Sequence, residues 1–178
     1  LACGASIDQV GAVRKHLSGV KGGQLARRCA PARVVSLIVS DVVGDDLSVI
    51  ASGPTAPDAS TFAEALVILE RYGIAAPEAR RYLLRGAQGE FPETPKRSDP
   101  IFARVENRLV VTNAAALEAA AEYLRSFGFS PRVVSDAIEG SARRAATEHA
   151  KIARNLRPGQ ALLSGGETTT VEKAGGGR

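Results

Sequence analysis

The sequence predicts an α/β protein with two α/β domains and mainly parallel sheets, the first domain being Rossmann-like. Two observations predict this class. Residues 33–40 form an apolar, β-branched run, which is typical of a strand covered on both faces in a parallel sheet. Beyond residue 101, strand-like and helix-like segments alternate along the chain. Such alternation indicates βαβ units, so the second domain is also expected to be α/β.

The first predicted element is a helix over residues 6–17. Ser6 and Gln9 form a capping-box pattern, and apolar residues follow at helical spacing. A glycine-rich loop is expected next, before the strand at 33–40. Thr61 and Glu64 form a second capping-box pattern, which predicts another helix that starts there.

A linker is expected between the two domains. Residues 86–100 are rich in glycine and proline, which disfavour regular structure, so the domains are predicted at residues 1–100 and 101–178. Asn113 is the predicted amino-terminal cap of an alanine-rich helix that ends at Gly128. The other predicted elements are strands at 108–112, 132–135 and 160–164, a helix at about 139–155, and a last strand after Gly165 and Gly166.

Composition and charge exclude several classes of function. The chain has 178 residues, of which 44% are hydrophobic and 24% charged, and this is enough for a buried core. Its net charge of +4 is scattered and only 4% of its residues are aromatic, so no nucleic-acid partner is expected. No apolar run reaches the roughly 18 residues of a membrane span, so we expect no membrane partner and a cytoplasmic location. The absence of methionine indicates a piece of a longer protein.

The densest polar stretch follows the strand at 33–40. Asp41 and Asp45 stand at its carboxyl end, where open α/β sheets bind ligands, and they are the candidate Mg²⁺ ligands or proton acceptors. Ser52, Gly53 and Thr55 then offer hydroxyl and backbone N–H groups to an anion. The alternative is a polar turn between a strand and a loop.

A second stretch joins cations to glycines. Arg14 and Lys21 lie close in sequence to Gly22 and Gly23, where the backbone can approach a phosphate or a carboxylate. The alternative is that the basic residues only complement the dipole at the carboxyl end of a helix. His16 is predicted to be structural, and His149 lies in a charged helix without a partner that the sequence reveals.

A third stretch comes directly after the strand at 160–164. The amides of Gly165 and Gly166 could hold phosphate, with Glu167 orienting a substrate or metal and Thr168 adding a hydroxyl. A tight hairpin is the alternative. Among motifs, there is no Walker A sequence, no GxGxxG after an early strand and no GxSxG, which argues against P-loop enzymes, dinucleotide-binding enzymes and triad hydrolases.

Together these stretches resemble the MOFRL-type glycerate 2-kinase family, whose members are also labelled hydroxypyruvate reductases. The matching text is Gly4-Ala-Ser-Ile, Val13-Arg-Lys-His-Leu-Ser18, Lys21-Gly-Gly23, Ser40-Asp-Val-Val-Gly-Asp-Asp46, Ile50-Ala-Ser-Gly-Pro-Thr55, Asp58, Thr61-Phe62 and Ser164-Gly-Gly-Glu-Thr-Thr169. The resemblance implies a two-domain enzyme that uses Mg²⁺ and transfers the γ-phosphoryl group of ATP to the 2-hydroxyl of D-glycerate in a cleft between the domains.

The resemblance also implies roles for the candidate residues. Arg14 and Lys21 would lie near the glycerate carboxylate or the phosphates, and Asp41 and Asp45 near the metal or the substrate hydroxyl. The residues that would bind substrate or ATP are Gly22, Gly23, Ser52, Gly53, Thr55, Asn113, Gly165, Gly166, Glu167 and Thr168.

The sequence departs from the family at both ends. Family members carry an upstream glycine-rich segment with a lysine regarded as catalytic, and a downstream Gly-Gly-Arg-Asn-type motif for which only Arg178 is a candidate. Both domains are therefore expected to be incomplete here, and the chain alone inactive while its parent is active. A homodimer is one option for the assembly. The alternatives are an NAD(P)H-dependent hydroxypyruvate reductase, which the missing dinucleotide fingerprint disfavours, and a non-catalytic α/β binding module.

Overall fold

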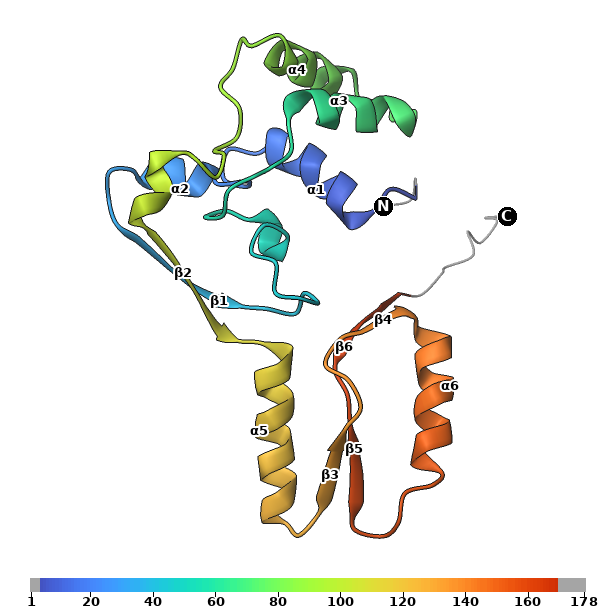
Figure 1. Ribbon diagram of the computed structural model, residues 1–178. Coiled ribbons are helices and arrows are strands. Elements are labelled where there is room, and N and C mark those ends of the chain that lie inside the picture. Colours follow the sequence, from blue (N-terminus) through green and yellow to red (C-terminus); the bar gives the residue numbers. More distant parts are fainter. Residues whose placement is uncertain (1–3, 170–178) are drawn as a thin grey trace. The chain divides into compact units, whose positions relative to one another are not determined.

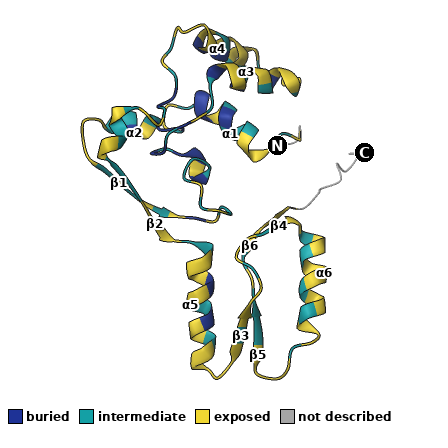
Figure 2. Ribbon diagram, viewed as in Figure 1, coloured by how far each residue is buried: buried dark blue, intermediate teal, exposed yellow. Residues whose placement is uncertain are grey.

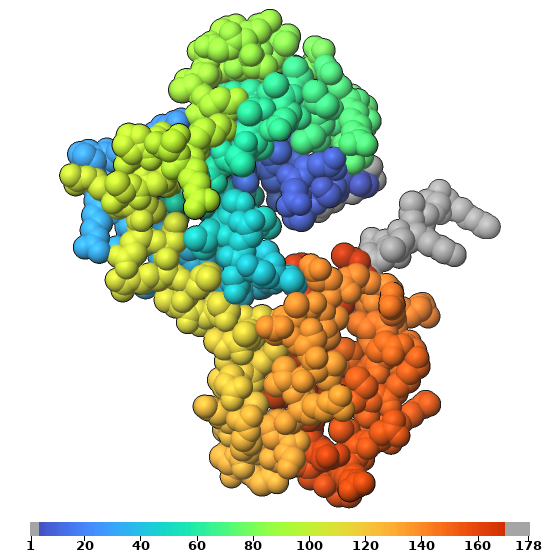
Figure 3. Space-filling model, in the orientation of Figure 1, coloured from blue at the N-terminus to red at the C-terminus, as the bar shows by residue number. Residues whose placement is uncertain are grey.

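The computed structural model describes residues 4–169 and divides into two compact units (Figure 1 and Figure 3). Unit 1 comprises Leu1–Ile38 and Asp46–Arg108, and unit 2 comprises Val39–Asp45 and Leu109–Arg178. The turn that carries Asp41 and Asp45 therefore belongs with the carboxyl-terminal half of the chain.

This division differs from the predicted one. The segment 86–100, expected to be a linker, lies within unit 1, where Thr94 and Pro95 are buried. The Thr94 hydroxyl donates a hydrogen bond of 3.0 Å to Oδ2 of Asp58. Proline and glycine in this segment disfavour a helix or strand, but they do not prevent the segment from packing.

Unit 1 is mainly helical. Its α-helices are α1 (Ile7–His16), α2 (Gln24–Cys29), α3 (Phe62–Arg71) and α4 (Pro77–Ala87), and its 3-10 helices are η1 (Ile50–Ser52) and η2 (Pro100–Arg104). Both predicted capping boxes are confirmed, Ser6 with Gln9 at α1 and Thr61 with Glu64 at α3. Helices α2 and α4 were not among the predicted elements.

Strands β1 (Val34–Val39) and β2 (Val105–Val111) form a two-stranded sheet. An ion pair of 2.8 Å joins Arg33 to Glu106 at the start of the two strands, and the Ser40 amide donates to the Val111 carbonyl at their end, so both strands run in the same direction. The strand at 33–40 is confirmed, but its predicted burial on both faces is not. Alternate residues of β1 are exposed. Among residues 4–169, the pair of β1 and β2 is the only strand pair that includes residues of unit 1.

Unit 2 has the predicted α/β alternation. It contains α5 (Asn113–Ser126), α6 (Ala142–Ala153) and the strands β3 (Ser130–Val133), β4 (Ile138–Ser141), β5 (Gln160–Leu163) and β6 (Gly166–Thr169). Strand β3 pairs with β5 and β4 with β6, both in parallel. The mainly parallel α/β class is therefore confirmed, with β4 occupying residues where the sequence predicted the start of a helix.

The cap of α5 is a correction to the prediction. Thr112, with φ −121° and ψ 165°, is the cap, and its side chain accepts a hydrogen bond of 3.2 Å from the Ala115 amide. Asn113 is instead the first helical residue. A threonine hydroxyl caps almost as well as an asparagine amide, so the sequence did not distinguish the two neighbours.

The core of unit 1 lies where α1, α3 and α4 meet (Figure 2). Phe62, Ala65, Leu69 and Leu83 are its buried members. The ring of Phe62 approaches Gly86 so closely that a Cβ there would lie 2.4 Å from it, and this allows α3 and α4 to pack tightly. Among residues 4–169, no helix is both long and apolar enough to cross a membrane.

Candidate functional site

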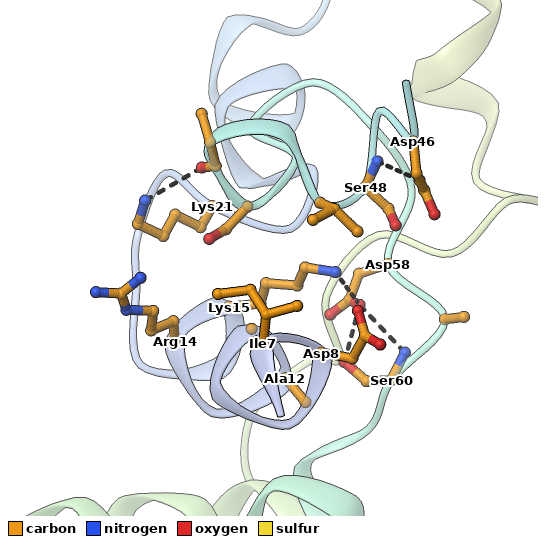
Figure 4. A pocket seen from close by; sticks show the side chains of 15 residues that line it. Ile7, Asp8, Ala12, Arg14, Lys15, Lys21, Asp46, Ser48, Asp58 and Ser60 are labelled. Carbon is orange, nitrogen blue, oxygen red and sulfur yellow. Dashed lines mark hydrogen bonds and ion pairs between the residues drawn. The ribbon is translucent and has the colours of Figure 1, made fainter. Parts of the chain in front are cut away.

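A charged pocket of about 370 Å³ lies in unit 1 (Figure 4). Helix α1 provides one wall, and the segment from Asp46 to Ser60 provides the other. The basic residues that line it are Arg14, Lys15 and Lys21, and the acidic ones are Asp8, Asp46 and Asp58. The structure thus brings together the predicted residues Arg14, Lys21 and Ser52, and it adds Lys15 and Asp58, for which the sequence suggested no role.

Lys15 and Asp58 form a buried ion pair at the pocket. The Lys15 Nζ atom lies 3.3 Å from Oδ1 of Asp58, and their side chains are 11% and 1% exposed. Oδ1 also accepts the Ser60 amide at 3.1 Å and the Ser60 hydroxyl at 2.8 Å. Burial raises the pKa of Asp58, but the Ser60 hydrogen bonds, the Lys15 charge and Thr94 outweigh it and hold the pKa below its ordinary value of 3.8. Asp58 is therefore a stable anion beneath the pocket.

A second polar chain continues behind Asp58. His16, whose side chain is fully buried, places Nδ1 at 2.8 Å from the Ala12 carbonyl and Nε2 at 3.0 Å from Oε2 of Glu93. Since both neighbours accept hydrogen bonds, both contacts are hydrogen bonds only when the ring carries two protons. Burial raises the pKa of Glu93, but the Phe62 amide, His16 and Lys96 outweigh burial, so the pKa lies below its ordinary value. The prediction that His16 is structural agrees with these contacts.

Two backbone segments pair along the far side of the pocket. The Gly22 amide donates to the Ser52 carbonyl at 2.9 Å, and the Gly23 amide to the Gly53 carbonyl at 2.8 Å. The Ser52 and Gly53 amides donate in turn to the carbonyls of residues 49 and 50. The structure therefore differs from the prediction that these amides are open to an anion, because each already has a backbone partner.

The same segment is conformationally strained. Ala51 and Ser52 have φ of 51° and 62°, and Gly53 follows with φ 60°. Side chains other than glycine rarely adopt this left-handed region, and such strain is concentrated at functional sites. Lys21 stabilises the turn by donating a hydrogen bond of 3.1 Å from Nζ to the Ala51 carbonyl.

Thr55 is a further departure from the prediction. Its hydroxyl donates to Oδ1 of Asn107 at 2.5 Å and accepts from the Ser36 hydroxyl at 3.0 Å. The residue is buried, so this hydroxyl joins β1 and β2 to the segment after η1 instead of facing a ligand.

A second polar region lies in unit 2, at the carboxyl ends of its strands. The Asn113 side chain donates to the Asp136 carbonyl and lies against Gly165, where a Cβ would be 2.1 Å from it. The Gly165 amide donates to the Ser135 carbonyl at 2.9 Å. Because these residues follow β2, β3 and β5, the structure gathers Asn113 and Gly165 at the edge where open α/β sheets bind ligands.

Gly165 and Gly166 do not form a hairpin turn. Strands β5 and β6 on either side of them pair with β3 and β4, so this alternative is wrong. The Gly165 amide is already bonded, and Glu167 and Thr168 are exposed on β6. His149, for which the sequence showed no partner, places Nε2 at 2.8 Å from the Ser164 hydroxyl just before this turn. Arg178 lies outside the described residues.

Asp41 and Asp45 also belong to unit 2. Asp41 is exposed and Asp45 is half-buried with φ 54°, and within residues 4–169 neither carboxylate has a hydrogen bond or ion pair. Among the described residues, no group of three or more histidine, cysteine or acidic side chains is arranged so that it could hold a metal ion by itself. Carboxylate oxygens are a ligand type that Mg²⁺ accepts beside waters and substrate phosphates, so the assignment of Mg²⁺ to Asp41 and Asp45 stays a prediction.

Comparisons with known proteins find one matching family and several similar, longer proteins. Residues 1–85 match the family described as "Domain of unknown function (DUF4147)". The chain is 48% identical over 176 residues to a protein of Agrobacterium vitis provisionally described as a hydroxypyruvate reductase, covering 95% of this chain and 39% of that one. It is 42% identical over 187 residues to the glycerate 2-kinase of Pyrococcus horikoshii, covering 99% of this chain and 42% of the relative.

A solved structure agrees with these similarities. The crystal structure of glycerate kinase from Thermotoga maritima superimposes with a TM-score of 0.75 at 39% identity, over 97% of this chain and 41% of that one. The chain thus spans about two fifths of the length of these relatives.

Fold and site together define the class as an α/β protein with parallel strands and polar residues at their carboxyl ends. More particularly, residues 1–85 match the family described as DUF4147, and nearly the whole chain is similar to a segment of proteins named glycerate 2-kinase and glycerate kinase. The resemblance inferred from the motifs is therefore confirmed.

Proposed function

We propose that the whole protein is a glycerate 2-kinase that transfers the γ-phosphoryl group of ATP to the 2-hydroxyl of D-glycerate. The observation that carries this proposal is similarity over nearly the entire chain to proteins named glycerate 2-kinase and glycerate kinase. The charged pocket of unit 1 supports it, because both substrates are anions and three basic residues line that pocket.

The chain's own residues supply charge and position. Phosphoryl transfer depends mainly on holding the reacting oxygens in line and on neutralising phosphate charge. Arg14 and Lys21 would bind a carboxylate or phosphate oxygen, and Asp41 and Asp45 would hold Mg²⁺, which when bound neutralises phosphate charge. The edge formed by Asn113 and Gly165 would position the ligand that lies against the strand ends.

The proposal is tested with the full-length protein, ATP, Mg²⁺ and D-glycerate, with the product identified by phosphorus NMR. We expect 2-phosphoglycerate, loss of turnover when EDTA removes Mg²⁺, and recovery when Mg²⁺ is restored. Absence of any phosphoglycerate from the folded protein would overturn the proposal, and formation of 3-phosphoglycerate would overturn its regiochemistry. In a parallel assay the 178-residue chain alone should give no product, and turnover equal to that of the full-length protein would contradict this expectation.

One observation favours a second candidate. The Agrobacterium vitis relative is described provisionally as a hydroxypyruvate reductase. The same preparation should therefore be incubated with hydroxypyruvate and NADH or NADPH while absorbance at the nicotinamide band is followed. We expect no consumption, since the chain lacks the glycine fingerprint of a dinucleotide site.

A further inference from the structure

We infer that Lys15 is an anion-binding residue of the unit 1 pocket and that Asp58 positions its ammonium group there. The inference rests on the proposed function and deepens it by assigning a substrate contact that the motifs did not indicate. The ligand chemistry is a negatively charged oxygen, from either the glycerate carboxylate or an ATP phosphate.

The hydrogen-bonding capacity of Asp58 is the first argument. A carboxylate has about four acceptor positions. Asp58 receives four donors: the Ser60 amide, the Ser60 hydroxyl, the Thr94 hydroxyl and Lys15 Nζ. Three of these come from groups other than Lys15, so the anion is already stabilised by neutral donors. Lys15 therefore fills only one of these acceptor positions, although its charge also balances the buried carboxylate.

The second argument is the number of hydrogen bonds that the Lys15 ammonium can donate. Its ammonium has three donors, and within the described residues a single hydrogen bond, of 3.3 Å to Oδ1 of Asp58, uses one of them. The side chain is almost fully buried yet lines the pocket (Figure 4). A buried ammonium needs partners for its remaining donors, and the pocket is the side on which a ligand oxygen can supply them.

The surroundings of Lys15 are the third argument. Gly22 approaches it so closely that a Cβ would lie 3.0 Å from the Lys15 Cβ, which fixes the side chain against the loop that carries Lys21. Arg14 and Lys21 line the same pocket. Of the acids that also line it, Asp46 accepts the Ser48 amide and Asp8 lies in the first turn of α1. Lys15 is thus the most buried of the three cations that line the pocket.

The competing explanation is that Lys15 and Asp58 form an ion pair that only stabilises the fold. A double variant distinguishes this explanation from a role in binding an anion. Lys15→Met and Asp58→Asn are compared singly and together in the full-length protein. Each single change leaves one uncompensated buried charge and should lower the melting temperature, whereas the pair removes both charges and should recover most of the loss. Substrate binding should not recover. We expect KM for D-glycerate or for ATP to be at least tenfold higher in the folded double variant than in the wild type, and the Lys15→Arg variant to show a smaller rise.

The control is another ion pair of the same unit. Arg27 lies 3.7 Å from Asp99 and neither residue lines the pocket, so Arg27→Met with Asp99→Asn should leave both KM values unchanged. The substrate whose KM rises identifies the source of the bound oxygen. Wild-type KM values for both substrates in the folded double variant would overturn the inference.

Calorimetry keeps the inference apart from the proposed function. D-glycerate, ATP and inorganic phosphate are titrated separately into the wild type and the double variant. If the wild type binds one of these anions but transfers no phosphoryl group, the proposed kinase activity fails, and at least tenfold weaker binding by the double variant still supports the role of Lys15. Equal binding by both proteins, or binding of none of the three anions by the wild type, overturns it.

Discussion

Asp58 links the stability of unit 1 to its charged pocket at the scale of a single residue. Its carboxylate receives hydrogen bonds from Ser60 and Thr94 and an ion pair from Lys15, and almost none of it reaches solvent. The sequence showed Asp58 only as one residue of the motifs that carry the family resemblance, without a role. Ser60 is a local donor, but Lys15 and Thr94 lie 43 residues before Asp58 and 36 after it, so no local pattern could reveal these two.

We predict an acid-dependent loss of stability through this residue. Because the pKa of Asp58 is lower in the folded state, its contribution is complete above the ordinary value of 3.8 and is lost as the pH falls through the folded-state pKa. Urea unfolding followed by circular dichroism between pH 7 and pH 2.5 measures it. Asp58→Asn should cost about 1–3 kcal/mol at pH 7 and show a shallower decline below pH 4. Parallel declines in the two proteins would show that other groups are responsible.

Gly22 offers a second test at this scale, with a matched control. Gly22 and Gly73 both have φ +58°, but a Cβ at Gly22 would meet Lys15 at 3.0 Å, while nothing lies within 4 Å of one at Gly73. Gly73→Ala should therefore cost only the left-handed backbone strain of about 1–2 kcal/mol. Gly22→Ala should cost more than this in urea unfolding. A loss no larger than that of Gly73→Ala would mean that Lys15 moves freely.

At the scale of elements, local signals and tertiary contacts can be separated. The capping boxes of α1 and α3 need only residues three positions apart, and the sequence predicted both helix starts. Strand β4 was missed because it has only four residues, of which Ile138 alone is a large apolar one, and only pairing with β6 defines it. The hairpin alternative at Gly165 failed for the same reason, since pairing partners are set by the sheet and not by the turn.

The cap of α3 provides the prediction for an element. Thr61→Ala removes the side chain that accepts the Glu64 amide and should lower the free energy of unfolding by about 1 kcal/mol. Thr61→Ser keeps the hydroxyl and serves as the control, for which a loss of less than half that size is expected. Thermal unfolding monitored by calorimetry measures both, and equal losses would assign the effect to the threonine methyl group.

At the scale of the whole molecule, the outer face of β1 is the feature with the clearest consequence. Val35, Leu37 and Val39 alternate along the strand and are 47%, 69% and 65% exposed. Among the described residues β1 pairs only with β2, so its other edge is unpaired. An apolar strand with an open edge promotes association between chains.

We therefore predict that the 178-residue chain, expressed alone, self-associates with rising concentration. Leu37→Lys should reduce the association at least severalfold in sedimentation velocity, because a charge on an edge strand opposes pairing. Val67→Lys, which changes a similarly exposed residue on α3, is the control and should have little effect. Association that is unaffected by Leu37→Lys would place the contact elsewhere.

The sequence by itself determined the α/β class, the parallel strands of unit 2, two helix caps and the family. These depend on periodicity, on residues a few positions apart or on contiguous motifs, all of which the chain carries locally. The tertiary structure alone decided that Lys15 meets Asp58, that Thr55 and the amides of Ser52 and Gly53 are occupied within the fold, and that Asn113 lies against Gly165. These outcomes depend on segments distant in sequence, and burial makes each polar group take whichever partner the fold brings to it.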